Sequence, residues 1–357
     1  MKNAVLNRDA FYVLPPKLLA AYMAILPVAN THDSAISVDD PASQASQPDR
    51  LIDTVQINDI GSFSCQQIEI FKLIDNVKVA VELGIELHVW LTEEGRPALP
   101  AQYHGLAQDV ATDILNSYPD KGLEGLANHA DYKYTLLYRA QPPTWLMDAA
   151  IQACCERFIQ KNNDCCFAGF VTGSVSKKRT RTVDGSLVGT SVRERLMSQI
   201  AEQGVDTVFL PINFMNAHWC CIVVKVQAKR IYFYDPLGQA PYKNACSTIA
   251  TRLKVTGLQE YEVIAQNNPI QFDAFSCGVY VCWMFIRLAV RGLRVDINAT
   301  ALPKRRFELF YFLKTGRLLA DEPEVDTTPP GDDGEDKAPP PSQDQEVDQL
   351  PATQVAQ

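Results

Sequence analysis

Cys277 has the sequence context of a cysteine nucleophile. Such a thiol needs a depressed pKa, a base that shares its proton and a group that orients the base. Cys277 follows Ser276, a possible helix cap, and opens the almost entirely apolar run 277–290, which predicts a buried helix with the thiol at its positive end. Gly278 would let a substrate backbone come close. The alternative is a small apolar cysteine that opens a core helix.

His218 and Asp235 are the candidate base and its orienting acid. His218 is the only histidine after residue 129, and it stands at the start of a predicted strand, 219–226. Asp235 ends the next predicted strand, 231–234, and the short polar connection predicts an antiparallel hairpin. Residues equidistant from such a turn face each other, so the two side chains should lie close together. Taken singly, they could be a polar strand end and a turn residue before Pro236.

Gln271 is a candidate donor to an oxyanion. It lies six residues before Cys277, in the loop that leads to the predicted helix. Its amide and the Cys277 main-chain N–H could stabilise the negative charge that develops on an attacked carbonyl. The alternative for Gln271 is a solvated loop side chain.

The order of these residues resembles the ubiquitin-like-protein-specific cysteine peptidases, the SUMO-deconjugating (sentrin-specific) type with the fold of the adenovirus protease. The matching segments are His218-Trp219, Tyr234-Asp235, Gln271-x5-Cys277-Gly278-Val279-Tyr280-Val281-Cys282 and Trp145-Leu146-Met147-Asp148-x-x-Ile151, the last of which resembles the family's Trp-Leu-Asn-Asp-x-x-Ile helix. The resemblance covers about 142–319 and says nothing about 1–140. It implies an α+β, papain-like fold whose nucleophile begins a buried central helix on a mixed β-sheet.

The resemblance also implies a role for each matched residue. Cys277 would be the nucleophile, His218 the general base and acid, Asp235 the orienting group and Gln271 the oxyanion donor. The expected reaction is cleavage after the Gly-Gly C-terminus of a ubiquitin-like modifier, above all SUMO, from its conjugates or precursor, with no metal or organic cofactor.

Four residues are expected on the substrate side. Trp145 would cover the narrow tunnel that admits two glycines, because a flat apolar face excludes anything bulkier. Trp219 is expected mainly to pack beside the imidazole. The full set is Trp145, Asp148, Trp219 and Gly278.

Three positions depart from the family pattern. Ser276 stands where many relatives have Asp, Met147 replaces the usual Asn, and Pro236 follows Asp235 where a Ser is frequent. None of these changes removes a catalytic group. The alternatives are a peptidase for a Nedd-type modifier or ubiquitin, an acyltransferase, and a catalytically silent modifier-binding module.

Composition divides the chain into four parts. The net charge of −9 comes from the tail 321–357, which holds eleven of the 42 acidic residues and one basic residue. The near-neutral remainder argues against a specific nucleic-acid binder. We expect an N-terminal segment and linker (1–50), a region of unknown role (51–140), the catalytic domain (141–320) and an acidic, Pro-rich, disordered tail.

The cysteines and the apolar runs indicate a nuclear or cytoplasmic protein. Adjacent cysteine pairs are a poor disulfide framework and lack the spacing of zinc ligands. No apolar run reaches the length of a membrane span, and no signal peptide is expected. The pattern further predicts a strand at 85–91, a helix near 109–115 and a helix over 145–159 with Thr144 as its N-cap. The oligomeric state is not predicted.

Overall fold

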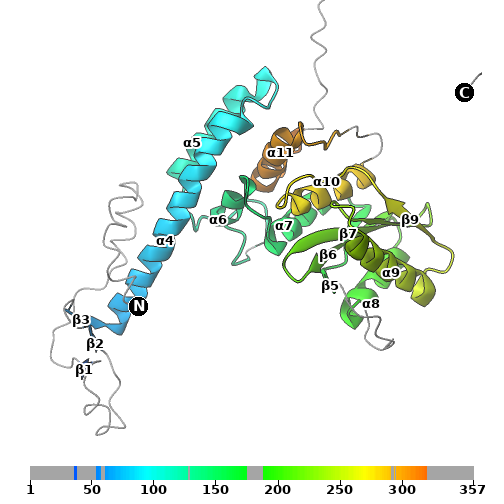
Figure 1. The fold of residues 1–357 in the computed structure, drawn as a ribbon, viewed down its shortest axis with the longest axis horizontal. Helices are drawn as coiled ribbons and strands as arrows, with labels where there is room; N and C mark the ends of the chain where they lie inside the picture. Colours follow the sequence, from blue (N-terminus) through cyan, green and yellow to red (C-terminus); the bar gives the residue numbers. More distant parts are fainter. Residues whose placement is uncertain are drawn as a thin grey trace, which may run out of the picture. The chain divides into compact units, whose positions relative to one another are not determined.

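The computed structural model describes residues 36–37, 54–57, 61–127, 129–174, 188–290, 293 and 295–319 (Figure 1). The helices are α4 (Cys65–Trp90), α5 (His104–Asn116), α6 (Tyr134–Leu137), α7 (Asp148–Ile159), α8 (Thr190–Ala201), α9 (Ala240–Gly257), α10 (Cys277–Ala289) and α11 (Leu302–Thr315), with short turns η1 (Leu91–Gly95), η2 (Ala101–Tyr103) and η3 (Tyr138–Ala140). The acidic tail and most of segment 1–50 lie outside the described residues. So does the basic segment Lys177-Lys178-Arg179-Thr180-Arg181.

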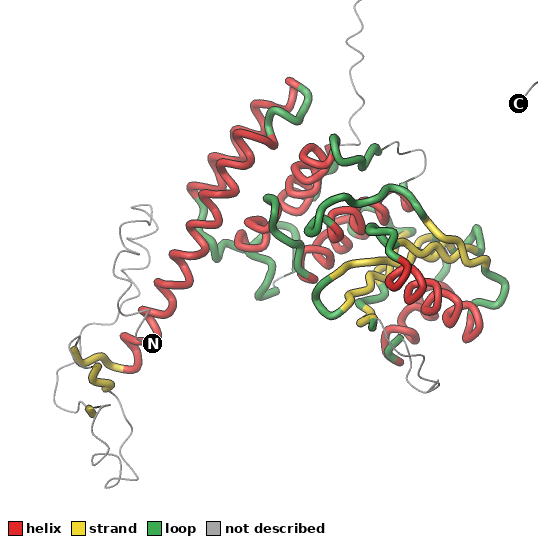
Figure 2. The backbone as a smooth tube through the Cα atoms, viewed as in Figure 1, coloured by secondary structure: helices red, strands yellow, loops and turns green. Residues whose placement is uncertain are grey.

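A mixed six-stranded sheet forms the centre of the C-terminal half (Figure 2). Its strands are β4 (Cys165–Phe167), β5 (Val171–Gly173), β6 (Thr207–Phe214), β7 (His218–Lys225), β8 (Arg230–Tyr234) and β9 (Glu262–Gln266). Strands β6, β7 and β8 are consecutive antiparallel neighbours, whereas β4 and β5 pair with β6, and β9 with β8, in parallel. A separate small sheet joins β1 (Ile36–Ser37), β2 (Thr54–Ile57) and β3 (Gly61–Ser64).

The two faces of the six-stranded sheet contribute to two different hydrophobic clusters. Residues of β7 alternate between them, because successive side chains of a strand point to opposite faces. Trp219, Cys221 and Val223 belong to the cluster that contains α10, which we call the α10 cluster, whereas Cys220 and Ile222 belong to the one that contains α9, the α9 cluster. Strand β7 therefore contributes side chains to both clusters.

Helix α10 is enclosed on all sides. Every residue from Cys277 to Ile286 is buried, as the apolar composition of the segment predicts. It contacts β6 and β7 on the sheet, and helices α7 and α11 elsewhere (Figure 1). The expected α+β class, with a buried helix that begins at Cys277 and packs on a mixed sheet, is confirmed.

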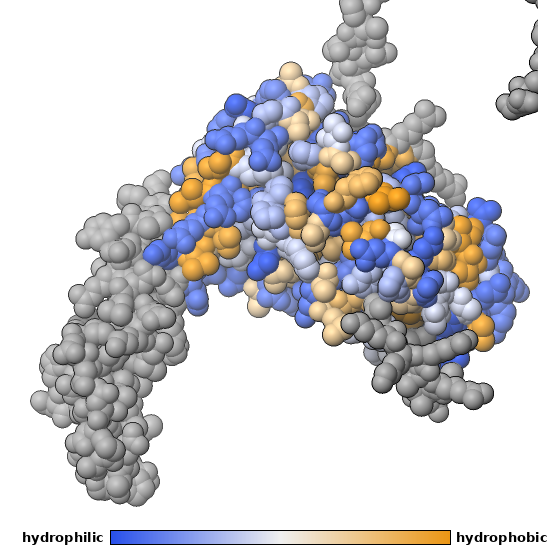
Figure 3. All heavy atoms as spheres, viewed as in Figure 1, coloured by the Kyte–Doolittle hydropathy of each residue, from blue (hydrophilic) through white to orange (hydrophobic). Residues whose placement is uncertain are grey.

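The strand predicted at 85–91 is wrong, because those residues belong to α4 and η1. Apolar and polar residues alternate there, but burial follows helical spacing: Leu87 and Leu91 are buried, whereas Ile85 and Val89 are exposed. Figure 3 shows apolar side chains over α4. The helix near 109–115 is confirmed as α5.

Residues before 141 share the α10 cluster with residues of the region 141–319. Leu87, Ile114 and Tyr138 lie in the same cluster as Trp283 of α10 and Phe310 of α11. Removing the region would therefore expose apolar surface of α11. The start of a catalytic domain at residue 141 stays a prediction.

Among the described residues, no helix is long and apolar enough to cross a membrane.

Buried thiols predict a loss of stability at alkaline pH. Burial raises the pKa of Cys155, Cys220 and Cys221 well above the ordinary range of a thiol. The folded state thus keeps protons that the unfolded chain loses above about pH 8.5. Stability should be complete below that pH and fall as pH rises, by up to about 1.4 kcal/mol per pH unit for each thiol. Urea unfolding in reductant from about pH 7.5 to 10 checks this, and an unchanged free energy of unfolding would contradict it.

Candidate active site

Cys277 lies at the first position of α10, with a side chain that is only 2% exposed. Burial raises the pKa of its thiol, while hydrogen bonds from the main-chain N–H groups of Trp219 and Gly278 act to lower it. The net direction is upward, opposite to the depressed pKa expected from the sequence. Attack by this thiol requires a base.

His218 and Asp235 form a buried pair at the end of the β7–β8 hairpin. His218 Nε2 donates to Asp235 Oδ1 over 2.7 Å, and both side chains are almost fully shielded from solvent. The predicted proximity of the two side chains is therefore correct, but the predicted register of the hairpin is wrong. The strands pair Lys225 with Arg230 and Cys221 with Tyr234, so the next position of β7, Cys220, lies opposite Asp235. His218 lies two residues further, on the same face, because side chains alternate with a period of two.

Asp235 is held by several further donors. Oδ1 also accepts the Leu237 N–H, and Oδ2 accepts the Gln239 N–H. Since the carboxylate occupies His218 Nε2, Nδ1 is the ring nitrogen left for the thiol. Within the described part of the chain no hydrogen bond joins His218 to Cys277. The two are linked through the main chain, because the N–H that faces Cys277 belongs to the residue after His218.

The same corner contains three possible metal ligands. Donor atoms of His218, Cys220 and Asp235 lie within 4.8 Å of one another. Two ligands of a tetrahedral zinc ion lie about 3.3 Å apart, since each is about 2.0 Å from the metal. The 2.7 Å between Nε2 and the carboxylate oxygen is shorter and fits a hydrogen bond.

Gln271 lies in the loop before α10 and is buried. Its side-chain amide donates to Asp273 twice, to the main-chain oxygen at 2.7 Å and to Oδ1 at 3.0 Å. The solvated-loop alternative is therefore excluded. A role as oxyanion donor stays a prediction.

The Trp145 segment is joined to the nucleophile through Leu146. Trp219 Nε1 donates to the Leu146 main-chain oxygen at 3.2 Å, and the Leu146 side chain packs on Gly278. The predicted start of this helix is wrong: α7 begins at Asp148, and Thr144 is no cap. Trp145 precedes the helix and is partly exposed, which leaves its indole accessible.

Asp148 and Trp219 are held by local contacts. The Asp148 carboxylate accepts the N–H of Ala149 in the first turn of α7, where the helix dipole favours an acid. Trp219 is buried and packs against Phe170 in the α10 cluster, on the face of β7 opposite to His218, so the expected packing beside the imidazole is wrong. The substrate contacts predicted for both stay predictions.

Gly278 has a different neighbour from the one expected. A Cβ atom at this position would lie 2.9 Å from the Leu146 Cβ, so the space beside the glycine holds Leu146 rather than room for a substrate backbone. We predict that Gly278→Ala lowers the free energy of unfolding by about 1–3 kcal/mol through overpacking. The measurement is urea unfolding. The matched control is Gly189→Ala, whose Cβ would meet nothing within 4 Å; equal losses in the two variants would contradict the prediction.

Sequence reasoning missed the polar network before the nucleophile. Ser276 precedes α10, but its hydroxyl makes no capping bond and donates instead to Asp273 Oδ2 over 2.5 Å. The same hydroxyl accepts from Arg306 Nη2 of α11 at 2.9 Å. The pattern Asp273-x-x-Ser276 before an apolar run was a usable signal, because aspartate at that spacing bonds nearby N–H groups. Nothing local indicated Arg306.

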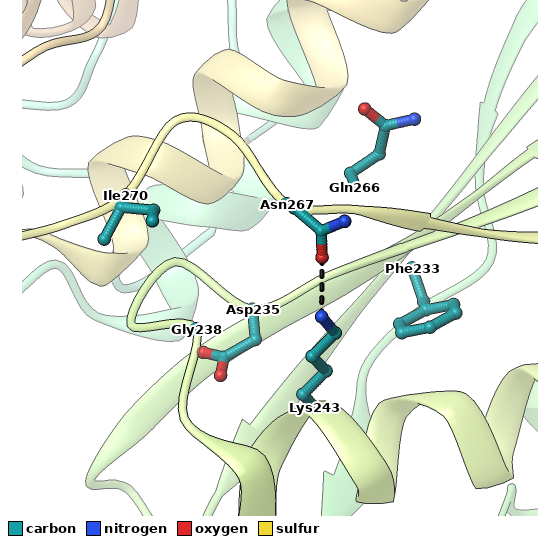
Figure 4. A pocket seen from close by; sticks show the side chains of 7 residues that line it. All are labelled: Phe233, Asp235, Gly238, Lys243, Gln266, Asn267 and Ile270. Atoms are coloured by element: carbon teal, nitrogen blue, oxygen red, sulfur yellow. Dashed lines mark hydrogen bonds between the residues drawn. The ribbon is translucent and has the colours of Figure 1, made fainter. Parts of the chain in front are cut away.

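A pocket of about 190 Å³ lies beside Asp235 and is lined by Phe233, Asp235, Gly238, Lys243, Gln266, Asn267 and Ile270 (Figure 4). Lys243 reaches from α9 to Asn267, with 2.6 Å between Nζ and Oδ1. Neither Cys277 nor His218 lines it. It is therefore separate from the thiol.

The comparisons with known proteins find one family of cysteine peptidases. Residues 176–310 match the model of the Ulp1 protease family, C-terminal catalytic domain. The matched region covers less than half of the chain and contains Cys277, His218, Asp235 and Gln271, so this similarity agrees with the predicted resemblance. Over 152 residues the chain is 28% identical to Ubiquitin-like-specific protease 1 of Saccharomyces cerevisiae. The alignment spans 40% of this chain and 23% of that protein, so most of the relative has no counterpart here.

Solved structures of Ulp1 are also similar. SUMO protease Ulp1 with its catalytic cysteine oxidized to a sulfonic acid gives a TM-score of 0.45 at 19% identity, over 63% of this chain and 98% of that chain. The C-terminal Ulp1 protease domain in complex with Smt3, the yeast ortholog of SUMO, gives 0.45 at 19% identity, over 58% and 93%. The Chaetomium thermophilum Ulp1-like SUMO protease catalytic domain gives 0.43 at 16% identity, over 61% and 90%.

Proposed function

We propose that this protein is a cysteine peptidase that cleaves after the Gly-Gly C-terminus of a ubiquitin-like modifier. The observation that supports this best is the arrangement around β7. A thiol at the start of a buried helix accepts an N–H from Trp219, the residue after an imidazole that is fixed by a buried carboxylate. The match to the Ulp1 protease family supports the same chemistry.

In the proposed reaction the thiol starts in its neutral form, which burial of Cys277 favours. His218 Nδ1 takes the thiol proton while the sulfur attacks the glycine carbonyl and a C–S bond forms. The Cys277 N–H stabilises the oxyanion, and the Gln271 amide contributes by giving up one of its two hydrogen bonds to Asp273. His218 then gives the proton to the leaving amine as the C–N bond breaks, and Asp235 stabilises the imidazolium between these steps. Water, activated by His218, hydrolyses the thioester and restores the thiol.

The substrate class rests on Trp145. Its partly exposed indole lies on a segment that Leu146 ties to Trp219 and Gly278, next to the nucleophile. A flat apolar lid there favours two glycines, which offer only backbone. SUMO is the modifier that we propose first, because the similar Ulp1 domain was solved with Smt3. A nuclear or cytoplasmic location belongs to the same proposal.

The experiment is an activity-probe assay. The purified chain is incubated with SUMO, a Nedd-type modifier and ubiquitin, each with a thiol-reactive group in place of its C-terminal carboxylate, beside a Cys277→Ala control. A covalent adduct with SUMO that disappears in the control is the expected result. An adduct with another modifier would support the proposed cysteine chemistry but would make that modifier, rather than SUMO, the proposed substrate. A folded protein that forms no adduct would favour an acyltransferase or a silent binding module.

A further inference from the structure

One carboxylate organises the loop between Gln271 and the nucleophile. Asp273 Oδ1 accepts three donors: the Gln271 side-chain amide at 3.0 Å, the Phe275 N–H at 2.9 Å and the Ser276 N–H at 2.7 Å. Oδ2 accepts the Ser276 hydroxyl. Burial alone would raise the pKa of Asp273, but these hydrogen bonds hold it below its usual range. This carboxylate thus connects Gln271 to Ser276, the residue that precedes Cys277.

A buried cation from a distant helix reaches the same loop. Arg306 of α11 is 2% exposed and donates through Nη2 to the Ser276 hydroxyl and through Nη1 to the Ala140 main-chain oxygen. Burial lowers the pKa of Arg306 to about 10, and the nearby Asp273 charge opposes this. Since a buried charge costs free energy unless it is compensated, the cation and Asp273 stabilise each other across Ser276.

We propose that Arg306, acting through Ser276 and Asp273, is a positioning residue for the oxyanion donors. The chain of hydrogen bonds ends at the Gln271 amide and at the turn that presents the Cys277 N–H. The inference rests on the proposed function, because it takes these two groups as the donors. It adds a residue, Arg306, that none of the matching motifs contains.

Two small reagents separate this role from activation of the thiol. p-Nitrophenyl acetate acylates Cys277 through a tetrahedral oxyanion: an S–C bond forms, the C–O bond breaks, and p-nitrophenolate and a proton leave. Iodoacetamide alkylates the same sulfur at a saturated carbon: an S–C bond forms, and iodide and a proton leave without any oxyanion. A defect in positioning slows only the first reaction, whereas a defect in the thiol slows both.

The experiment compares both rates in the wild type, Ser276→Ala and Arg306→Gln, each corrected with a Cys277→Ala background, over a range of pH. We expect acylation to fall by about 10-fold or more while alkylation and its pH profile change by less than about 2-fold. Arg306→Lys should be acylated faster than Arg306→Gln but more slowly than the wild type. Lysine keeps the positive charge but cannot donate through two nitrogens, as the guanidinium does. Arg305→Gln is the matched control, since Arg305 is also buried on α11 but pairs with Glu308.

Two results would overturn the inference. Unchanged acylation in folded Arg306→Gln would make the residue purely structural. A parallel loss of acylation and alkylation, with a shifted pH profile, would place its effect on the thiol. If Arg306→Gln does not fold, Ser276→Ala decides, because it retains the buried charge. Neither reagent needs a modifier, so a wild type that cleaves no modifier would overturn the proposed function and leave this test intact.

Discussion

Cys277→Ala is expected to lower kcat/KM for cleavage of a SUMO precursor by at least about 10⁴-fold. The change removes one sulfur atom from a buried site and leaves the main-chain N–H groups of Trp219 and Gly278 in place. Affinity for the modifier should therefore persist, because the sulfur is needed only to form the thioester. Initial-rate kinetics and a binding titration with the same precursor measure the two effects separately.

The matched control for this variant is Cys282→Ala. Cys282 lies on the same helix and is equally buried, and its free thiol forms a hydrogen bond with the free thiol of Cys154. Losing this thiol should cost about 1 kcal/mol of stability and leave kcat within a few-fold of the wild type. If Cys282→Ala were as inactive as Cys277→Ala, or if Cys277→Ala kept more than about 1% of activity, the assignment of the nucleophile would be wrong.

Asp235→Ala is expected to lower kcat by about 10³-fold and to destabilise the fold by about 2–4 kcal/mol. The rate falls because His218 loses the acceptor that fixes its ring at 2.7 Å and stabilises its protonated form. Stability falls because the N–H groups of Leu237 and Gln239 lose their acceptor as well. Cleavage kinetics and urea unfolding of the same preparation measure both.

Asp235→Asn separates the two roles of the carboxylate. One oxygen remains to accept from His218, but an amide NH₂ now faces either the imidazole or the Gln239 N–H. We expect an activity between those of the wild type and Asp235→Ala. An Asp235→Ala protein with a kcat within tenfold of the wild type would remove Asp235 from the proposed mechanism.

The pairing of His218 with Asp235 shows what strand patterns can predict. The hairpin and its two ends were predictable from the polar turn and the flanking apolar runs. The register was wrong by two residues, because turn length alone did not fix which residues pair. An error of one residue would have placed the two side chains on opposite faces, whereas an error of two kept them on the same face.

Other parts of the site depend on tertiary contacts that no local pattern contains. Arg306 reaches Ser276 across 30 positions, and the space beside Gly278 is filled by Leu146 from another segment. The strand wrongly predicted at 85–91 had alternating polarity, but Leu87 and Leu91 pack in the α10 cluster with helical spacing. Local motifs predicted the groups that we propose to react, whereas the groups that contact them come from elements distant in the chain.

The position of the site between the two clusters affects how the protein would lose activity. Cys277 begins a helix of the α10 cluster, whereas His218 lies on the face of β7 that points to α9 and packs against Tyr242 of that helix. Partial opening of either layer would separate thiol and imidazole while the other layer stays folded. Enzyme activity would then report the less stable of the two layers, and inactivation by mild denaturant would precede the loss of most helical signal.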